Sequence, residues 1–264
     1  MISIIGYSLS LLVGFSLGLV GGGGSILVIP ILVYCFHMDP AQAVSYSLFI
    51  VGLSACSGSI GHIRQKTIDR NAAFNFGIPS VITLFLVRGW LVKQIPLVLY
   101  QHNSVLVSRQ ALMMTIFSIL MVAAGVSMIR GKVYSPEDDK LSRPLLIFRG
   151  AITGAITGFI GIGGGFIIVP SLVLFAGLPM RKAIGTSLAI ITLNCLVGIL
   201  SNREALDNLD YGFLFRFASL AIIGILLGTW FIHFVPDKRL KPIFGIIILL
   251  MSVLVIMRNF IHAS

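Results

Sequence analysis

Two glycine clusters are the parts of this sequence best suited to hold a ligand with the backbone. The first runs from Gly21 to Gly24 and the second comprises Gly161 and Gly163 to Gly165, and a short apolar run ending in proline follows each. Because glycine disfavours helix, we expect each surrounding run to bend or unwind there, which leaves unpaired N–H groups where the next helix begins. Such groups attract anions, and glycine lets an oxyanion approach closely. The residues that we predict to contact an anion are Gly21, Gly23, Gly24 and Ser25 in the first cluster and Gly163, Gly164 and Gly165 in the second.

A second interpretation of the glycines is that they only allow helices to pack closely, as small residues do in membranes. The sparser glycines fit this interpretation better than the two dense clusters do. They are Gly14 and Gly18 in the first half of the chain and Gly154 and Gly158 in the second. For the clusters themselves both interpretations stay open.

A polar stripe on the next predicted helix would complete an anion site. Its members recur in both halves with spacings of 7, 4 and 4 residues, which keeps them on one helical face. They are Ser47, Ser54, Gly58 and His62 in the first half and Ser187, Asn194, Gly198 and Asn202 in the second. Hydroxyl and amide groups bind an anion without a permanent charge and so permit its release. We predict that Ser47, Ser187 and Asn194 line the site; the alternative is hydrogen bonding between helices, worth about 0.6–2 kcal/mol per contact.

Few other side chains offer chemistry. No carboxylate lies inside an apolar run. We expect His62 and His233, which stand near predicted segment ends, to lie at the membrane interface rather than to relay protons. The cysteines stand apart from one another, and no lysine follows a glycine cluster as in a phosphate-binding loop. We therefore predict no catalytic residue, no metal ion and no cofactor, and the identity of a coupling ion stays open.

The composition excludes a water-soluble fold. Hydrophobic residues make up 57% of the 264 residues and charged residues only 11%, with a mean hydropathy of +1.02. A soluble domain carries roughly 25% charged residues and could not bury this much apolar side chain. The net charge of +10 resides in short connectors, which indicates anchoring at the lipid surface rather than nucleic-acid binding. We predict a multi-pass membrane protein whose partner is the lipid bilayer and not nucleic acid.

Eight apolar runs are long enough to cross the ~30 Å hydrocarbon layer as helices. They cover residues 2–36, 41–63, 72–92, 105–129, 145–176, 181–201, 212–234 and 240–260. The two runs that contain the glycine clusters exceed one straight crossing, so we predict a broken or kinked helix in each. We therefore expect an all-α integral membrane protein of about eight transmembrane helices: a first repeat over 1–130, a polar connecting loop over 131–144 and a second repeat over 145–264.

An internal repeat relates the two halves. A shift of 140 residues aligns segments 14–50 and 154–190 with 12 identities, five glycines and a proline among them, and Asp69 matches Asp210 after one further residue. Four crossings in each half would let both halves enter the membrane from the same side. We therefore predict parallel repeats, with a slight excess of basic residues favouring cytoplasmic termini. Glycine segments that fold as re-entrant hairpins would change the crossing count.

These features resemble the sulfite exporter TauE/SafE family, also called the toluene-sulfonate uptake permease group. The resemblance rests on the glycine-rich first segment that ends in a proline, on the stretch Ala183-Ile184-Gly185-Thr186-Ser187-Leu188, and on their repetition over almost the whole chain. It implies multi-pass carriers of sulfite, sulfonates and related anions in the bacterial inner membrane. By matching position it also implies that Thr186 contacts substrate. The first half departs from this pattern at Tyr46, which we expect to narrow one half of the pathway.

The sequence thus predicts a secondary transporter of small anions, acting as an exporter or an uptake permease. Two alternatives come from other classes. A membrane-embedded scaffold subunit or enzyme component would show a catalytic constellation or a partner surface, and an anion channel would show unitary conductance. The sequence leaves open the substrate, the transport direction, the coupling ion and whether the chain forms a homo-oligomer.

Overall fold

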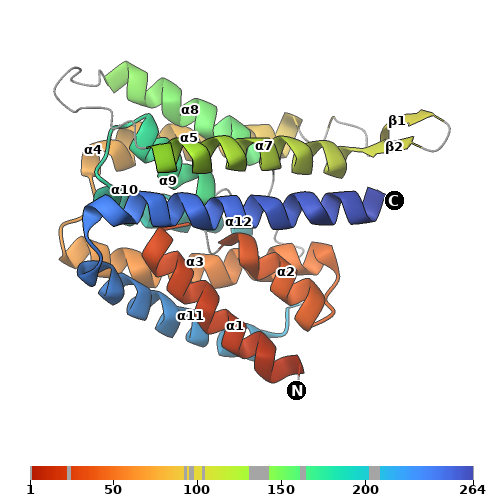
Figure 1. Ribbon diagram of the computed structural model, residues 1–264, viewed down its shortest axis with the longest axis horizontal. Helices are drawn as coiled ribbons and strands as arrows, with labels where there is room; N and C mark the ends of the chain where they lie inside the picture. Colours follow the sequence, from red (N-terminus) through yellow and green to blue (C-terminus); the bar gives the residue numbers. More distant parts are fainter. Residues whose placement is uncertain are drawn as a thin grey trace.

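The computed structural model describes residues 2–22, 25–91, 94, 98–102, 105–130, 143–160, 165–201 and 209–263. Helices form almost all of this structure, and one short antiparallel hairpin is added to them (Figure 1). The elements of the first half are α1 (Ile2–Val20), α2 (Ser25–Cys35), α3 (Pro40–Arg64), α4 (Arg70–Ala72), η1 (Ala73–Gly77), α5 (Ile78–Leu86), η2 (Val87–Leu91), β1 (Val98–His102), β2 (Val105–Ser108) and α7 (Arg109–Arg130). Those of the second half are α8 (Arg143–Ile160), α9 (Gly165–Leu174), α10 (Met180–Ser201), α11 (Tyr211–Phe231), η4 (Ile232–Phe234) and α12 (Asp237–Ala263).

Four helices in the described part of the chain are long and apolar enough to cross a membrane. They span Gln42–Arg64, Arg70–Leu91, Met180–Leu200 and Tyr211–Phe234. The second of them is one continuous helical run, because η1 and η2 are π-helical turns that join α4 to α5 and extend it. Helices suit such runs since backbone groups in lipid must pair within the segment. The predicted helical membrane protein is confirmed, whereas four crossings rather than eight meet these criteria.

Each glycine tract turns the chain back on itself. The ring of Tyr7, near the start of α1, packs 5.5 Å from that of Phe36, which follows the end of α2. In the second half, the Arg149 guanidinium near the start of α8 donates a hydrogen bond to the Phe175 carbonyl, just after α9. The first helix of each half is therefore broken, as predicted, and its two parts form a helical hairpin whose ends lie together.

Glycines hold each hairpin against a helix of the other half. A Cβ atom at Gly18 would lie 2.5 Å from the Ile225 carbonyl oxygen, and one at Gly158 would lie 2.7 Å from that of Leu84, so neither position has room for a side chain. Residue numbers rise together along both pairs: Ser10, Gly14 and Gly18 contact Phe217, Ala221 and Ile225, while Gly150, Gly154 and Gly158 contact Phe76, Ser80 and Leu84. α1 therefore runs parallel to α11, and α8 runs parallel to the α4–α5 run. The sparser glycines thus serve close packing, as the second interpretation predicted.

Two further pairs between the halves, α3 with α10 and α7 with α12, are antiparallel. We call the contact surface between α3 and α10 the α3–α10 seam. Its facing residues, in order along α3, are Leu48 with Gly198, Gly52 with Cys195, Gly58 with Leu188 and His62 with Gly185. α7 and α12 lie side by side along the long axis in Figure 1. They are antiparallel as well, since Gly125 faces Leu249 and Gly245 faces Ile129.

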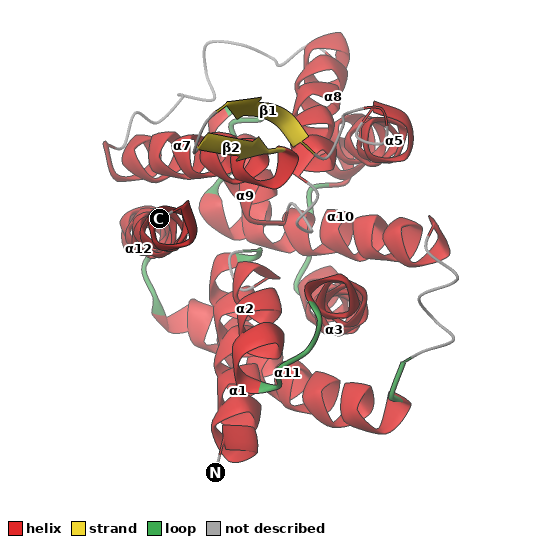
Figure 2. Ribbon diagram, turned by 90° about the vertical axis from the view of Figure 1, so that its right-hand side faces the viewer, coloured by secondary structure: helices red, strands yellow, loops and turns green. Residues whose placement is uncertain are grey.

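The two halves are therefore related by an approximate two-fold axis that runs across the helices, and the predicted parallel repeat is wrong. The physical reason is the glycine tract. Because the hairpin returns the chain to its starting end, it adds no net crossing, and the next repeat begins on the opposite side. Figure 2 views α3, α5 and α12 nearly end-on and shows α1 and α8 on opposite sides of the molecule. We call the end where α3 ends and α10 begins the Asp69 end, and the opposite end the Asp210 end.

The β1–β2 hairpin distinguishes the first half from the second among the described residues. Gln101 pairs with Leu106 and His102 with Val105, and the register shifts between Val98 and Tyr100. The offset between the halves is 140 residues at the glycine tracts but only 120 at the equivalent glycines Gly125 and Gly245. The first half thus carries an insertion before α7, and the hairpin within it projects beyond α7 in Figure 1.

Candidate functional site

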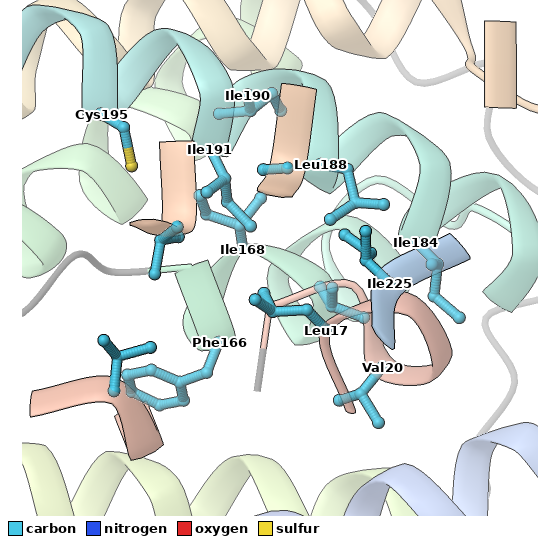
Figure 3. Close-up of a cluster of buried hydrophobic side chains, with 14 of the residues drawn as sticks. Leu17, Val20, Phe166, Ile168, Ile184, Leu188, Ile190, Ile191, Cys195 and Ile225 are labelled. Carbon is cyan, nitrogen blue, oxygen red and sulfur yellow. The ribbon is translucent and has the colours of Figure 1, made fainter. Parts of the chain in front are cut away.

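The two glycine tracts touch inside a core built from both halves. Figure 3 shows this core, in which Leu17 and Val20 of α1 lie near side chains of α9, α10 and α11. A Cβ atom at Gly22 would overlap the Gly165 carbonyl oxygen and would lie 3.1 Å from the Phe166 nitrogen. The absence of side chains at this point is what allows backbone from opposite halves to meet.

Gly21 and Ser187 are brought together at the end of α1. Gly21 has the left-handed backbone conformation that favours glycine, with φ of 73°. Its N–H donates to the Leu17 carbonyl at 2.7 Å, and its carbonyl accepts from the Ser187 hydroxyl at 2.7 Å. The same hydroxyl lies 2.7 Å from the Ile184 carbonyl. Both predicted site residues are thus paired with protein groups, and Ser187 fixes the helix break instead of leaving its proton free.

Thr186 and Tyr46 occupy equivalent positions and make equivalent bonds. The Asp69 N–H donates to the Thr186 hydroxyl oxygen at 3.0 Å, and the Asp210 N–H donates to the Tyr46 hydroxyl oxygen at 2.6 Å. Each aspartate also caps its own helix. The Asp69 carboxylate accepts a hydrogen bond from the Ala72 N–H, and the Asp210 carboxylate accepts one from the Phe213 N–H. Tyr46 therefore replaces Thr186 as a bond between helices at the other end of the molecule.

Asn194 and Ser54 are equivalent residues of α10 and α3, and both bury polar atoms that lack a partner. Asn194 is 4% exposed and Ser54 is 0% exposed. Within the described residues, neither amide atom of Asn194 nor the Ser54 hydroxyl has a hydrogen-bond partner. Leaving a buried polar group unpaired costs about 1–3 kcal/mol, and native proteins mostly avoid it. These two residues are the strongest candidates for contact with a bound species.

Both candidates lie at the same level of the α3–α10 seam. Gly52, one half-turn before Ser54, faces Cys195, and a Cβ there would lie 3.0 Å from the cysteine Cβ. Asn194 immediately precedes that cysteine. Ser47, a further predicted site residue, is also buried on α3. Ser54 and Asn194 therefore stand at the same level of the two helices, one from each half, close to the two-fold axis.

Part of the predicted site falls beyond the described residues. Gly23, Gly24, Gly163, Gly164 and Asn202 lie outside them. Ser25 begins α2 and Gly165 begins α9, but the Ser25 side chain is also outside the described structure. Their contact with an anion stays a prediction.

His62 and Ser80 are two further buried polar residues of the described structure. His62 is 1% exposed near the end of the Gln42–Arg64 span, where Gly185 leaves room for the imidazole to pack against α10. Its position at the membrane interface stays a prediction. Its spacing from Ser54 on one helical face was the signal that placed it on the seam. Ser80 is fully buried on α5, and its hydroxyl lacks a partner among the described residues. No pattern in the sequence singled it out.

Comparisons with known proteins find similarity to membrane transporter proteins. A family model described as "Sulfite exporter TauE/SafE" matches residues 7–256. A probable membrane transporter protein of Xylella fastidiosa (strain 9a5c) is 32% identical over 256 residues, which cover 94% of this chain and 92% of the relative. One of Methanocaldococcus jannaschii is 31% identical over 209 residues, covering 75% and 72%.

A more distant relative extends the comparison. The probable membrane transporter protein YunE of Bacillus subtilis (strain 168) is 24% identical over 241 residues, covering 84% of this chain and 83% of the relative. No solved structure matches the chain. The family match covers nearly the whole chain, from the first glycine hairpin to α12. The chain therefore belongs to the sulfite exporter TauE/SafE family.

Proposed function

We propose that this chain is a secondary membrane transporter of small anions such as sulfite, sulfonates and related sulfur-containing or organic anions, located in a bacterial inner membrane. The family and the relatives' names as probable membrane transporters support the transport role. The architecture supports it too. Many secondary transporters consist of inverted repeats and bind their substrate near the bilayer midplane, where broken helices from both repeats meet.

The observation that carries the proposal is the unpaired pair Asn194 and Ser54. The amide offers two N–H donors and the hydroxyl offers one, and neither group carries a permanent charge. A hydrogen bond to a charged group contributes about 1.5–3 kcal/mol, enough to hold an oxyanion and still release it. The Asn194 carbonyl accepts from water or from a proton on the anion. Backbone N–H groups of the glycine tracts complete this proposed shell.

Replacing Asn194 with leucine is expected to lower anion uptake about ten- to a hundredfold, because one hydrogen bond to a charged group is lost. Leucine has the same branching of heavy atoms, and it removes a buried group that has no partner in the protein. The melting temperature should therefore stay unchanged or rise. The measurement is uptake of ³⁵S-labelled sulfite and methanesulfonate by liposomes that contain the purified protein, together with thermal unfolding in detergent.

Controls for this substitution come from the same two helices. Ser54→Ala should lower uptake in the same way. Ser57→Ala and Thr192→Val should not, because these hydroxyls donate to carbonyls of their own helices, Leu53 and Leu188. Normal uptake by folded Asn194→Leu would show that the site is elsewhere. Unitary conductance would indicate a channel, and a lack of uptake together with a stable copurifying partner would indicate a scaffold subunit.

The inverted arrangement also changes the inferred orientation in the membrane. We infer that α3, the α4–α5 run, α7, α10, α11 and α12 cross the bilayer and that the two hairpins enter it from opposite sides. Basic residues of the described chain then gather at the Asp69 end: Arg64, Lys66, Arg70, Arg130, Arg143, Arg149, Arg181, Lys182, Lys238, Arg239 and Lys241. At the Asp210 end stand Arg88, Arg109, Arg216 and Arg258. The positive-inside rule places the Asp69 end in the cytoplasm.

Both termini are consequently expected outside the cytoplasm, opposite to the slight preference drawn from eight crossings. α1 begins and α12 ends at the Asp210 end. A C-terminal alkaline phosphatase fusion should be active in cells, and a green fluorescent protein fusion at the same residue should be dark. A fluorescent green fluorescent protein fusion together with an inactive alkaline phosphatase fusion would show that the C-terminus lies in the cytoplasm, opposite to the orientation inferred here.

A further inference from the structure

His62 is a buried histidine at the Asp69 end of the α3–α10 seam. It is 1% exposed, and its Nδ1 lies 2.7 Å from the Thr67 hydroxyl. The ring packs against α10, where a Cβ atom at Gly185 would lie 3.1 Å from the same nitrogen. The other ring nitrogen, Nε2, has no hydrogen-bond partner among the described residues. The imidazole is therefore held in place through one nitrogen while the other stays available.

The seam connects this nitrogen with the proposed anion site. Ser54, Gly58 and His62 recur at intervals of 4 residues and so lie on one face of α3. At 1.5 Å per residue, His62 is about 12 Å from Ser54 along the helix axis. Gly58, between them, packs against the side chains of Leu188 and Ile225. Thus Nε2, the Ser54 hydroxyl and the Asn194 amide are three unpaired polar groups along one seam.

Charged groups surround His62 mainly with positive charge. The Asp69 carboxylate lies 3.9 Å from the Lys182 ammonium, so this acid is already paired. Arg181 and Lys182 lie at the start of α10, and Arg64 lies in the last turn of α3. His233 lies in η4, just after α11. None of these groups offers a free negative charge to an imidazolium at position 62.

We propose, building on the transport function proposed above, that His62 binds the proton that travels with the anion. When an anion binds at Ser54 and Asn194, Nε2 takes a proton from water, and the imidazolium that forms balances the charge of that anion. When the anion leaves on the other side, the same proton leaves Nε2 for water there. One anion and one proton cross together, and no net charge moves.

Burial makes the two binding events depend on each other. An imidazolium without an anion would be an unpaired charge in a dry, cation-rich corner, and such burial is costly. An anion held only by neutral donors would be a buried negative charge without a counter-charge, and its burial would be costly as well. Each ligand therefore favours binding of the other, and this reciprocity is the thermodynamic condition for cotransport.

A pH gradient tests this proposal with methanesulfonate, which stays ionised across the working range. Liposomes that contain the protein are clamped at zero voltage with valinomycin and equal potassium. A gradient of one pH unit, acidic outside, should then accumulate the anion about tenfold inside, because a pH unit is a tenfold ratio of protons. His62→Gln, which keeps a hydrogen-bonding side chain, should abolish accumulation beyond equal concentrations. In lightly buffered detergent, the wild-type protein should also take up a proton for each anion it binds, a measurement that needs no variant.

Two other histidines supply controls. His37→Asn changes an exposed histidine at the opposite end of α3, and His233→Gln changes an exposed one near His62. Both variants should accumulate the anion like the wild type. Accumulation by His62→Gln, or its loss only in His233→Gln, would overturn the assignment. Wild-type uptake that ignores the gradient would overturn the coupling and leave the transporter intact. No methanesulfonate uptake by the wild type would refute both the coupling and the sulfonate cargo.

Discussion

Replacing Gly14 or Gly154 with alanine is expected to lower the melting temperature by roughly 6–12 °C, corresponding to at least ~3 kcal/mol. A Cβ atom at Gly14 would lie 2.8 Å from the Ala221 Cα and would overlap its carbonyl oxygen. One at Gly154 would meet Ser80 in the same way, 2.7 Å from its Cα. The obstacles are helix backbones, so the clash is relieved only if a hairpin separates from its partner helix. Thermal unfolding and size-exclusion chromatography in detergent measure the effect.

Two other glycines on crossing helices provide matched controls for these substitutions. Nothing lies within 4 Å of a Cβ atom built at Gly61 or Gly89, so alanine there should leave the melting temperature unchanged. The two-fold relation further requires similar losses at Gly14 and Gly154. A large loss at one position and none at the other would contradict the equivalence of the two hairpins.

Gly21→Ala is expected to reduce anion uptake by more than tenfold, while a fraction of the protein molecules still folds. The residue has φ of 73°, a conformation that costs an alanine roughly 1–2 kcal/mol. The added Cβ would also lie 2.7 Å from the Ser187 hydroxyl oxygen and 2.9 Å from the Ile184 Cα. Relief of these contacts shifts the break between α1 and α2 away from α10. Uptake per folded protein in liposomes measures the loss.

The control for backbone strain is Gly177, which has φ of 63° in the turn between α9 and α10. Its equivalent in the first half is His37, with φ of 52°, so a side chain is tolerated in this turn. Gly177→Asn should therefore transport normally, because asparagine readily adopts the left-handed conformation. Uptake at the wild-type rate by folded Gly21→Ala would exclude the glycine break from the transport site.

The helical membrane fold, the internal repeat and the helix breaks could be predicted because each depends on local sequence. Run length and hydropathy decide whether a segment suits the bilayer, and a dense glycine cluster decides where its helix stops. The direction of the second half could not be predicted in this way. It depends on whether the chain bends or reverses at the tract, and contacts between distant residues, such as Ser10 with Phe217, decide that.

The candidate site was predictable in part for a related reason. The spacing of the polar stripe placed Asn194 on the seam, but spacing does not reveal which polar groups already have partners. Ser187 and Thr186 pair with backbone groups of Gly21 and Asp69, and those partners come from other helices. For His62, position near a helix end suggested the interface. Its burial depends on the space that Gly185 leaves on the neighbouring helix.

The packing of α1 against α11 also determines when this protein can finish folding during its synthesis. α1 ends at Val20 and α11 begins at Tyr211, so the partner surface of the first hairpin is made about 190 residues later in translation. At 5–20 residues per second, roughly 10–40 s separate the two. Throughout this interval the glycine face of α1 lacks its native neighbour, and the nascent chain must stay shielded by the insertion machinery or by lipid. Docking of the first hairpin therefore waits for the synthesis of α11, and the fold of the first half depends on the second.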